Sequence, residues 1–323
     1  MKRTAPIVLL IAGAVAAISV GSSQVDDFWS VLLNPGSNEI VWQIRFPRVM
    51  AAVIVGAALG IAGLLAQGAC NNAIAEPAIL GTAAGASFGA VIGIATGVVQ
   101  VGSLGALACG AAGALLATSI TFRLAAFRGA LSSFNLIIVG IAVSAIFTSL
   151  VGITSAVLNR ADARSISFWS LGSLALVTNE NLLGIVITTL MGAVIAWFIA
   201  PMLDRLSLGD HSAFHLGVNV PRVRLLALVS LSLLAGGAVS TVGVIAFIGL
   251  AAPHIARFIY GPSHRALIMH SALIGAFIVL LADTLSRTIA QPNELPIGLA
   301  TALIGAPILI ALVTVKNNVW KTQ

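Results

Sequence analysis

Lysine, which phosphate-binding loops require, is scarce in this sequence and occurs only at Lys2, Lys316 and Lys321. A Walker A loop needs Gly-Lys-Ser/Thr ahead of a helix, and none of these lysines has that setting. The sequence also contains no HExxH motif, no nucleophile elbow and no pair of carboxylates in a plausible cleft. We therefore expect that the chain is not an enzyme and does not bind ATP by that route.

Asp283 is the acidic residue nearest to the interior of an apolar segment; the other acids fall in loops or at segment ends. Arg287 follows at i+4, the spacing of a favourable ion pair along a helix. A structural Asp283–Arg287 pair is the favoured interpretation. The alternative is ion coupling, because proton- or sodium-driven carriers keep ionisable groups inside the membrane. With so few interior charges, the energy for any transport is expected from another subunit.

Histidine and cysteine offer little metal chemistry here. His211 and His215 have an i,i+4 spacing compatible with a metal, but no third ligand is in view. Cys70 and Cys109 stand far apart in apolar surroundings and are interpreted as small buried residues. We expect no metal and no cofactor bound by this chain.

The composition indicates that the chain lies in a membrane. Of 323 residues, 59% are apolar and only 8% charged, against about 25% charged in soluble domains. Each membrane span needs about 20 apolar residues, which predicts an all-α, polytopic membrane protein with about ten transmembrane helices in one domain, 1–323. The net charge of +6 is scattered singly, which argues against nucleic acid. The expected spans are 5–22, 46–67, 78–99, 103–122, 134–158, 182–202, 224–245, 247–260, 267–288 and 297–315.

The charges predict the orientation of these spans. With both termini in the cytoplasm, eleven basic residues lie inside and five outside, the sense of the positive-inside rule. The five outer residues are Arg45, Arg48, Arg160, Arg164 and Arg287. A cleaved signal peptide is the alternative for the first segment, because Lys2 and Arg3 precede an apolar run.

Small residues and breaks shape the expected helices. Glycines at 81, 85, 89, 93 and 97 recur every four residues, and Gly56 and Gly60 repeat the spacing; both patterns favour close helix packing in lipid. Glu76-Pro77 is expected to begin the third span, where proline and a carboxylate suit a first turn. The eighth segment, 247–260, is too short to cross straight and predicts a partial helix buried by its neighbours.

The longest polar cytoplasmic segment is 203–224. It predicts a short helix, a break at Gly217, and a second short helix begun by Asn219 and Pro221. It is either a solvated loop or a docking element for a cytoplasmic partner.

Several segments together carry a family resemblance. Two of these segments lie in the N-terminal half: Arg45-Phe46-Pro47-Arg48 with the later GAALGIAG, and QGACNNAIAEPAILGTAAGA from Gln67. Four follow in the C-terminal half: FWSLGSL at 168–174, LGVNVPRVR at 216–224, IAFIGLAAPHIAR at 245–257 and LAD…ELPIGLATALIGAP at 281–307. The sequence thereby resembles, over nearly its whole length, the iron-chelate and vitamin B12 permeases (FecCD type) of type II ABC importers. It departs from the family pattern at Asn71 and Ala73, where arginine and proline are usual.

The resemblance implies partners and a location. A second permease subunit, identical or paralogous, would enclose a central path in the bacterial cytoplasmic membrane. Two ATP-binding cassette subunits would hold ATP and Mg, and an extracytoplasmic binding protein would deliver the substrate. The implied function is import of an iron chelate, a ferric siderophore or haem. Cobalamin is the alternative substrate, and a self-sufficient secondary carrier or channel is the alternative class.

The resemblance also assigns roles to residues. Docking of the binding protein would fall to Arg45, Arg48 and Arg287. Coupling to the ATPase would fall to Ser207, Leu208, Gly209, Asp210, Leu216, Gly217, Val218 and Asn219. The translocation path and gate would include Ser132, Ser133, Asn135, Thr148, Ser149 and Thr154.

Overall fold

The computed structural model describes residues 5–20, 27–127, 131–175, 177–289 and 293–320. In these residues the secondary structure is helical throughout, without a strand, which confirms the all-α prediction. The helices are α1 (Ala5–Ser19), α2 (Phe28–Leu33), the π-helix η1 (Ile40–Arg45), α3 (Phe46–Ala69), α4 (Thr82–Ala95), α5 (Leu104–Ala125), α6 (Ser133–Val157), α7 (Arg160–Ser170), α8 (Asn179–Leu206), α9 (Asp210–His215), α10 (Val220–Val242), α11 (Ile248–Tyr260), α12 (His264–Ser286) and α13 (Ile297–Trp320).

Each of the ten expected spans overlaps one of these helices. Six helical stretches of the described residues are long and apolar enough to cross a membrane: η1 with α3, α5, α6, α8, α10 and α12. The apolar parts of α1, α4 and α13 are shorter, and α11 has 13 residues. The structure thus supports a polytopic membrane protein, and the count of ten crossings stays a prediction.

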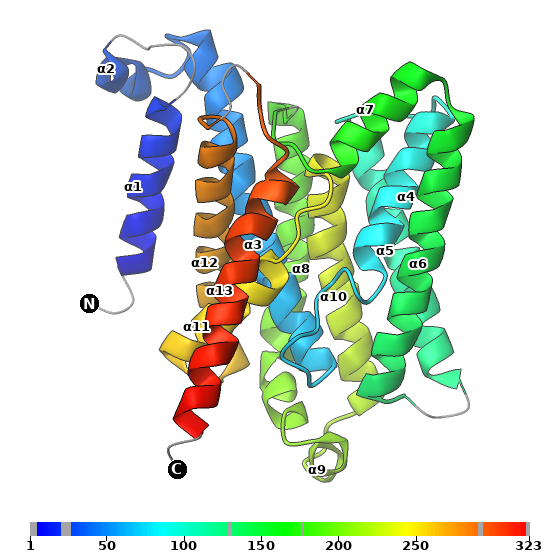
Figure 1. Ribbon diagram of the computed structural model, residues 1–323. Coiled ribbons are helices and arrows are strands. Elements are labelled where there is room, and N and C mark those ends of the chain that lie inside the picture. Colours follow the sequence, from blue (N-terminus) through cyan, green and yellow to red (C-terminus); the bar gives the residue numbers. More distant parts are fainter. Residues whose placement is uncertain (1–4, 21–26, 128–130, 176, 290–292, 321–323) are drawn as a thin grey trace.

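The helices form a bundle with two distinct ends (Figure 1). The short helix α9 lies at one end, here named the α9 end, and α2 and α7 lie at the opposite α7 end. Helix α3 packs against α12, α10, α11 and α8, while α4, α5 and α6 form a second group that α10 joins to the first. The C-terminal part of α13 lies toward the α9 end.

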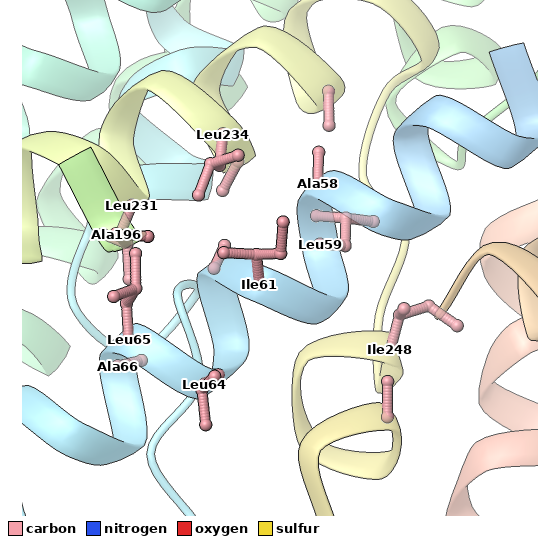
Figure 2. Packing of buried hydrophobic residues seen from close by; sticks show 14 of the residues in the cluster. Ala58, Leu59, Ile61, Leu64, Leu65, Ala66, Ala196, Leu231, Leu234 and Ile248 are labelled. Carbon is pink, nitrogen blue, oxygen red and sulfur yellow. The ribbon is translucent and has the colours of Figure 1, made fainter. Parts of the chain in front are cut away.

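The core follows α3. Figure 2 shows Leu64 and Leu65 of α3 among apolar side chains from α8, α10 and α11. In the apolar window of α3, 78% of residues are buried inside the chain, whereas the corresponding window of α6 is only 22% buried. A helix that is apolar on all sides and mostly uncovered by its own chain must be covered by lipid or by a partner chain. Helix α6 therefore lies at the periphery of this chain.

Close backbone approach explains the glycines in the spans. A Cβ at Gly56 would clash with the carbonyl of Gly275, and one at Gly60 with the carbonyl of Ser271, where α3 crosses α12. Gly85 and Gly89 of α4 face carbonyls of α5 in the same way. The packing interpretation is thereby confirmed for these four positions. Gly81 and Gly97 were wrongly placed in the helical row, because they flank α4 with positive φ.

Replacing Gly56 with leucine is expected to cost about 3 kcal/mol, because overpacking a filled site forces two helices apart. Gly152 on α6 is the matched control, since its Cβ would meet no atom within 4 Å. Thermal unfolding of the two purified variants in detergent checks this. Equal melting temperatures for the two leucine variants would contradict the packing assignment.

The chain between α3 and α4 departs most from the expectation. Residues 70–81 form turns inside the bundle instead of the start of a span. Side chains provide hydrogen bonds to carbonyls that no helix pairs: the hydroxyl of Thr121 donates to Leu80 O (3.1 Å), and that of Ser144 donates to Ala78 O (2.7 Å). Irregular backbone is tolerated at membrane depth only when protein groups satisfy it in this way.

Glu76 is the second correction in this stretch. Its carboxylate does not cap α4; it accepts a hydrogen bond from the backbone N–H of Phe247 at 3.0 Å. Phe247 is the N-cap of α11 and has a φ of 68°. Glu76 thus complements the positive end of the short helix α11, and this bond joins the two irregular segments, 70–81 and 243–247.

Candidate functional site

The three arginines that the resemblance assigns to docking lie together at the α7 end, in an ion cluster of which the sequence spacing predicted only one pair. The expected Asp283–Arg287 pair is present, with 3.5 Å between Arg287 Nε and Asp283 Oδ2. The shorter contacts come from Arg48: its Nε and Nη2 lie 2.9 Å from Asp283 Oδ1, and its Nη1 lies 2.8 Å from Glu294 Oε1. We name Arg45, Arg48, Asp283, Arg287 and Glu294 the outer ion cluster.

The outer ion cluster also holds the end of α1. Arg45 Nη1 donates to the carbonyls of Ile18 (2.9 Å) and Ser19 (3.1 Å), and Arg287 donates to Ala17 and Val20. Arginines near the last carbonyls of a helix are favoured by its dipole. The three arginines are at most 8% exposed. Their charges therefore organise this chain itself, and docking of a binding protein by them stays a prediction.

Residues 203–224, which include the residues assigned to coupling, form a projecting element at the α9 end (Figure 1). Of the residues assigned to coupling, Ser207, Leu208, Asp210, Leu216, Gly217 and Asn219 are exposed, Gly209 is half-buried and Val218 is buried. The large apolar side chains Leu208, Phe214 and Leu216 are uncovered here. Ala213 and Val218 face inward and anchor the element. Exposed apolar groups on a short, anchored helix are typical of a docking surface.

The structure corrects the second half of this segment. The helix begun by Asn219 is no separate short helix but the first turn of the long α10. Asn219 is its N-cap and accepts from the N–H of Arg222 at 3.1 Å, as expected of asparagine there. The break at Gly217 is confirmed, with a φ of 79° that glycine adopts without strain.

The residues assigned to the path and gate fall into two places on α6. Ser132 is the N-cap of α6, with its hydroxyl accepting from Asn135 N at 3.1 Å, and Ser133 follows it at the α9 end. Thr148 lies in the half of α6 nearer the α7 end, beside exposed Ser149. Thr154 donates to the carbonyl of Leu150 in its own helix (2.8 Å), a bond common for threonine in membrane helices.

Thr148 lines a cavity of about 280 Å³ between α4, α6, α7 and the segment 243–247. Three further hydroxyls reach this cavity, those of Ser87, Ser144 and Ser170. The buried Ser87 hydroxyl has no hydrogen-bond partner among the described residues. The sequence did not predict that these serines lie around one cavity, because each is a single serine in an apolar helix. The cavity can offer weak hydrogen bonds but no charge.

Sequence reasoning missed the role of Arg224. Arg224 is one of the eleven basic residues expected at the cytoplasmic ends of the spans, and its side chain is 0% exposed. Its neighbourhood also contains Cys70, the buried C-cap of α3. Burial raises the pKa of the Cys70 thiol to about 12, although the Arg224 charge favours the thiolate. Because this pKa lies far above neutral pH, Cys70 stays a protonated thiol, in line with its interpretation as a small buried residue.

Comparison with known proteins places this arrangement among transport subunits. Residues 8–315 match the model of the FecCD transport family. The chain is 37% identical to the iron(3+)-hydroxamate import system permease protein FhuB of Bacillus subtilis, over 83% of this chain and 71% of that protein. It is 35% identical to the hemin transport system permease protein HmuU of Yersinia pestis (84% and 82%). It is 32% identical to the vitamin B12 import system permease protein BtuC of Vibrio cholerae (83% and 80%).

A solved structure shows the same fold. An inward-facing metal-chelate type ABC transporter superposes with a TM-score of 0.83 at 29% identity, covering 96% of this chain and 97% of the other. A more distant likeness, with a TM-score of 0.61 at 17% identity, is found to PsaBC from Streptococcus pneumoniae. The second likeness concerns the fold alone.

Proposed function

This chain belongs to the FecCD transport family, and from that membership we propose that it is the membrane-spanning permease of an ATP-driven importer for an iron chelate, a ferric siderophore or haem. It is an ABC transporter permease, and its relatives are transport subunits. The identification of the chelate is our proposal. Cobalamin is a second candidate, because the B12 permease of Vibrio cholerae is similar over 83% of this chain.

The exposed α9 element is the single observation that carries the proposal. ATP-driven transport by a chain without a Walker A loop needs a partner that hydrolyses ATP, and α9 with its flanks presents Leu208, Phe214 and Leu216 as uncovered apolar groups. Two cytoplasmic ATPase subunits, holding ATP and Mg, would cover this surface. The α9 end would then face the cytoplasm of a bacterial cell, with both termini on that side.

The self-sufficient carrier is disfavoured by the state of Asp283. Its fully buried carboxylate is held between Arg48 and Arg287, so exchanging a coupling ion there would require both pairs to break. A buried carboxylate that loses a paired cation is strongly destabilised. Energy from a separate subunit avoids that cost.

The path would run beside α6, whose outward surface this chain leaves largely uncovered. A second permease, identical or paralogous, would face it across the path. Of the serines that line the cavity near Thr148, Ser87 has a hydroxyl without a hydrogen-bond partner among the described residues, which suits a brief contact to an oxygen-rich chelate. The hydroxyls of Ser144 and Ser170 already donate to Ala78 O and Ser167 O. The chelate need not bind tightly in this cavity. The populations of the outward and inward states depend on how much better a ligand or partner binds one state than the other. Substrate selection would rest with the extracytoplasmic binding protein.

The outer ion cluster is the proposed docking site of that binding protein. Three arginines and two carboxylates leave it one net positive charge, which complements an acidic partner surface. Replacing Arg45 with glutamine is expected to weaken docking about tenfold at low salt, and less at high salt because mobile ions screen the attraction. Binding of the purified binding protein to the permease in nanodiscs measures this. An unchanged dissociation constant would refute the assignment of Arg45.

Uptake in cells tests the proposed function directly. A strain lacking this chain, with and without its re-expression, is supplied with labelled ferric hydroxamate, haem or cobalamin. Loss and rescue for one ligand are expected and name the substrate. In liposomes the purified chain alone should accumulate none of them. Accumulation that needs neither ATP nor other subunits would overturn the importer assignment in favour of a carrier.

A further inference from the structure

Arg224 occupies a junction of four helices at the α9 end. It lies near the start of α10 and is among the largest fully buried side chains of the chain. A fully buried arginine must satisfy its donors with protein groups. The partners it uses come from α9, from the end of α3 and from the start of α6.

The bonds of Arg224 use the whole guanidinium. Its Nη1 and Nη2 each donate to one carboxylate oxygen of Asp210 at 2.9 Å. Nη2 also donates to Ser133 Oγ (2.9 Å) and Nη1 to Leu131 O (2.9 Å). Nε donates to Ala69 O at 3.0 Å. All five N–H donors of the side chain are therefore engaged.

The geometry of these bonds limits how α9 can move. Asp210 is the first residue of α9, and its side chain is 45% exposed at the edge of the docking surface. The paired N–H···O bonds of an arginine–carboxylate fork hold both planes in one orientation. A displacement of α9 relative to α10 must therefore break the fork or drag the guanidinium. Either event disturbs the bonds to Ser133 and Leu131, because the same two nitrogens make them.

From this junction, and resting on the proposed function, we propose that Arg224 is the positioning residue that transmits movement of α9 to the start of α6. The α9 element receives the movement of the ATPase through its exposed side. The Asp210 fork passes it to the guanidinium, and Ser133 passes it to the N-cap of α6. Ser132 and Ser133, assigned to the gate, thereby change position when nucleotide binds to the partner subunit.

A cysteine reporter on α6 tests the transmission. Phe134, next to Ser133, is 70% exposed, and Phe134→Cys is placed in a parent with Cys70→Ala and Cys109→Ala. The complex with its ATPases is reconstituted in membranes, and the labelling rate with a water-soluble maleimide is compared between nucleotide-free and ATP–vanadate states. We expect the Phe134→Cys protein, without further changes, to show about a tenfold change in rate, within the usual range of coupling between sites.

Two single variants and their combination separate the link from simple loss of folding. Asp210→Asn and Ser133→Ala each change a partner of the same nitrogen, Nη2 of Arg224. Each is expected to reduce the nucleotide-dependent change to about threefold or less, and the double variant no further, because residues of one network are not additive. Exposed Arg123, in the last turn of α5 and outside residues 203–224, provides the control Arg123→Gln, which should keep the full change.

The outcomes distinguish the inference from the proposed function. Additive effects of Asp210→Asn and Ser133→Ala, or a full nucleotide response in either, would overturn the transmission through Arg224. A merely structural role would lower the melting temperature and leave the response of the folded complex intact, which also overturns it. If Asp210→Asn releases the ATPase, Ser133→Ala still decides, since Ser133 lies away from the uncovered tip of α9. Failure of the unmodified chain to assemble with any ATPase would instead refute the proposed function.

Discussion

Replacing Asp283 with asparagine is expected to lower the melting temperature of the purified permease by about 10 °C. Removing one partner of a buried ion pair costs about 3–5 kcal/mol, and each kcal/mol shifts the melting temperature by about 2–4 °C in a large domain. Asp283 is 0% exposed and contacts both Arg48 and Arg287. Without it, Glu294 is the remaining carboxylate of the outer ion cluster.

Glu294→Gln is the matched control, because this carboxylate pairs with Arg48 and its side chain is 40% exposed. Its loss is expected to cost about 1 kcal/mol or less. Combining Asp283→Asn with Arg48→Gln should recover part of the stability, since neither charge is then left unpaired. Thermal unfolding of the variants in one detergent measures these differences. Equal melting temperatures for Asp283→Asn and Glu294→Gln would show that the cluster is not the structural anchor of the α7 end.

Replacing Gly217 with proline is expected to reduce ATP-driven uptake at least about tenfold, as the loss of a coupling element would. Gly217 has a φ of 79°, whereas proline is confined to about −65°. Proline also lacks the N–H that Gly217 donates to Phe214 O at 3.0 Å. The end of α9 would therefore open, and its apolar tip would lose its shape while the membrane helices keep theirs.

Gly217→Asn is the control for this variant. Asparagine keeps the N–H and tolerates positive φ better than other residues with a side chain, so it should preserve most of the uptake. The measurements are uptake per ATP hydrolysed and co-purification of the ATPase. Normal uptake by Gly217→Pro would remove the basis for assigning residues 203–224 to coupling.

The sequence alone determined the class of structure and the broad function. Apolar runs of span length have one physical solution in lipid, the helix, so α3, α5, α6, α8, α10 and α12 fall where the hydropathy predicts them. Gly217 and Asn219 acted as the expected helix stop and start, because these signals are local. The order of the family segments, from residues 45–48 to 281–307, was sufficient for the family assignment, which the comparisons confirm.

Tertiary structure decided which helix each polar side chain serves. Glu76 looked like the first-turn carboxylate of its own span, yet it caps α11, because the bundle brings residues 70–81 beside 243–247. Asp283 showed its i+4 partner in the sequence but not Arg48, its closer one, 235 residues away. Arg224 counted in the sequence only as a basic residue at the cytoplasmic end of a span, and the structure buries it among three other segments. A pattern along the chain reports neighbours one turn away, whereas these three partnerships depend on how separate helices pack, and packing is settled by shape over the whole bundle.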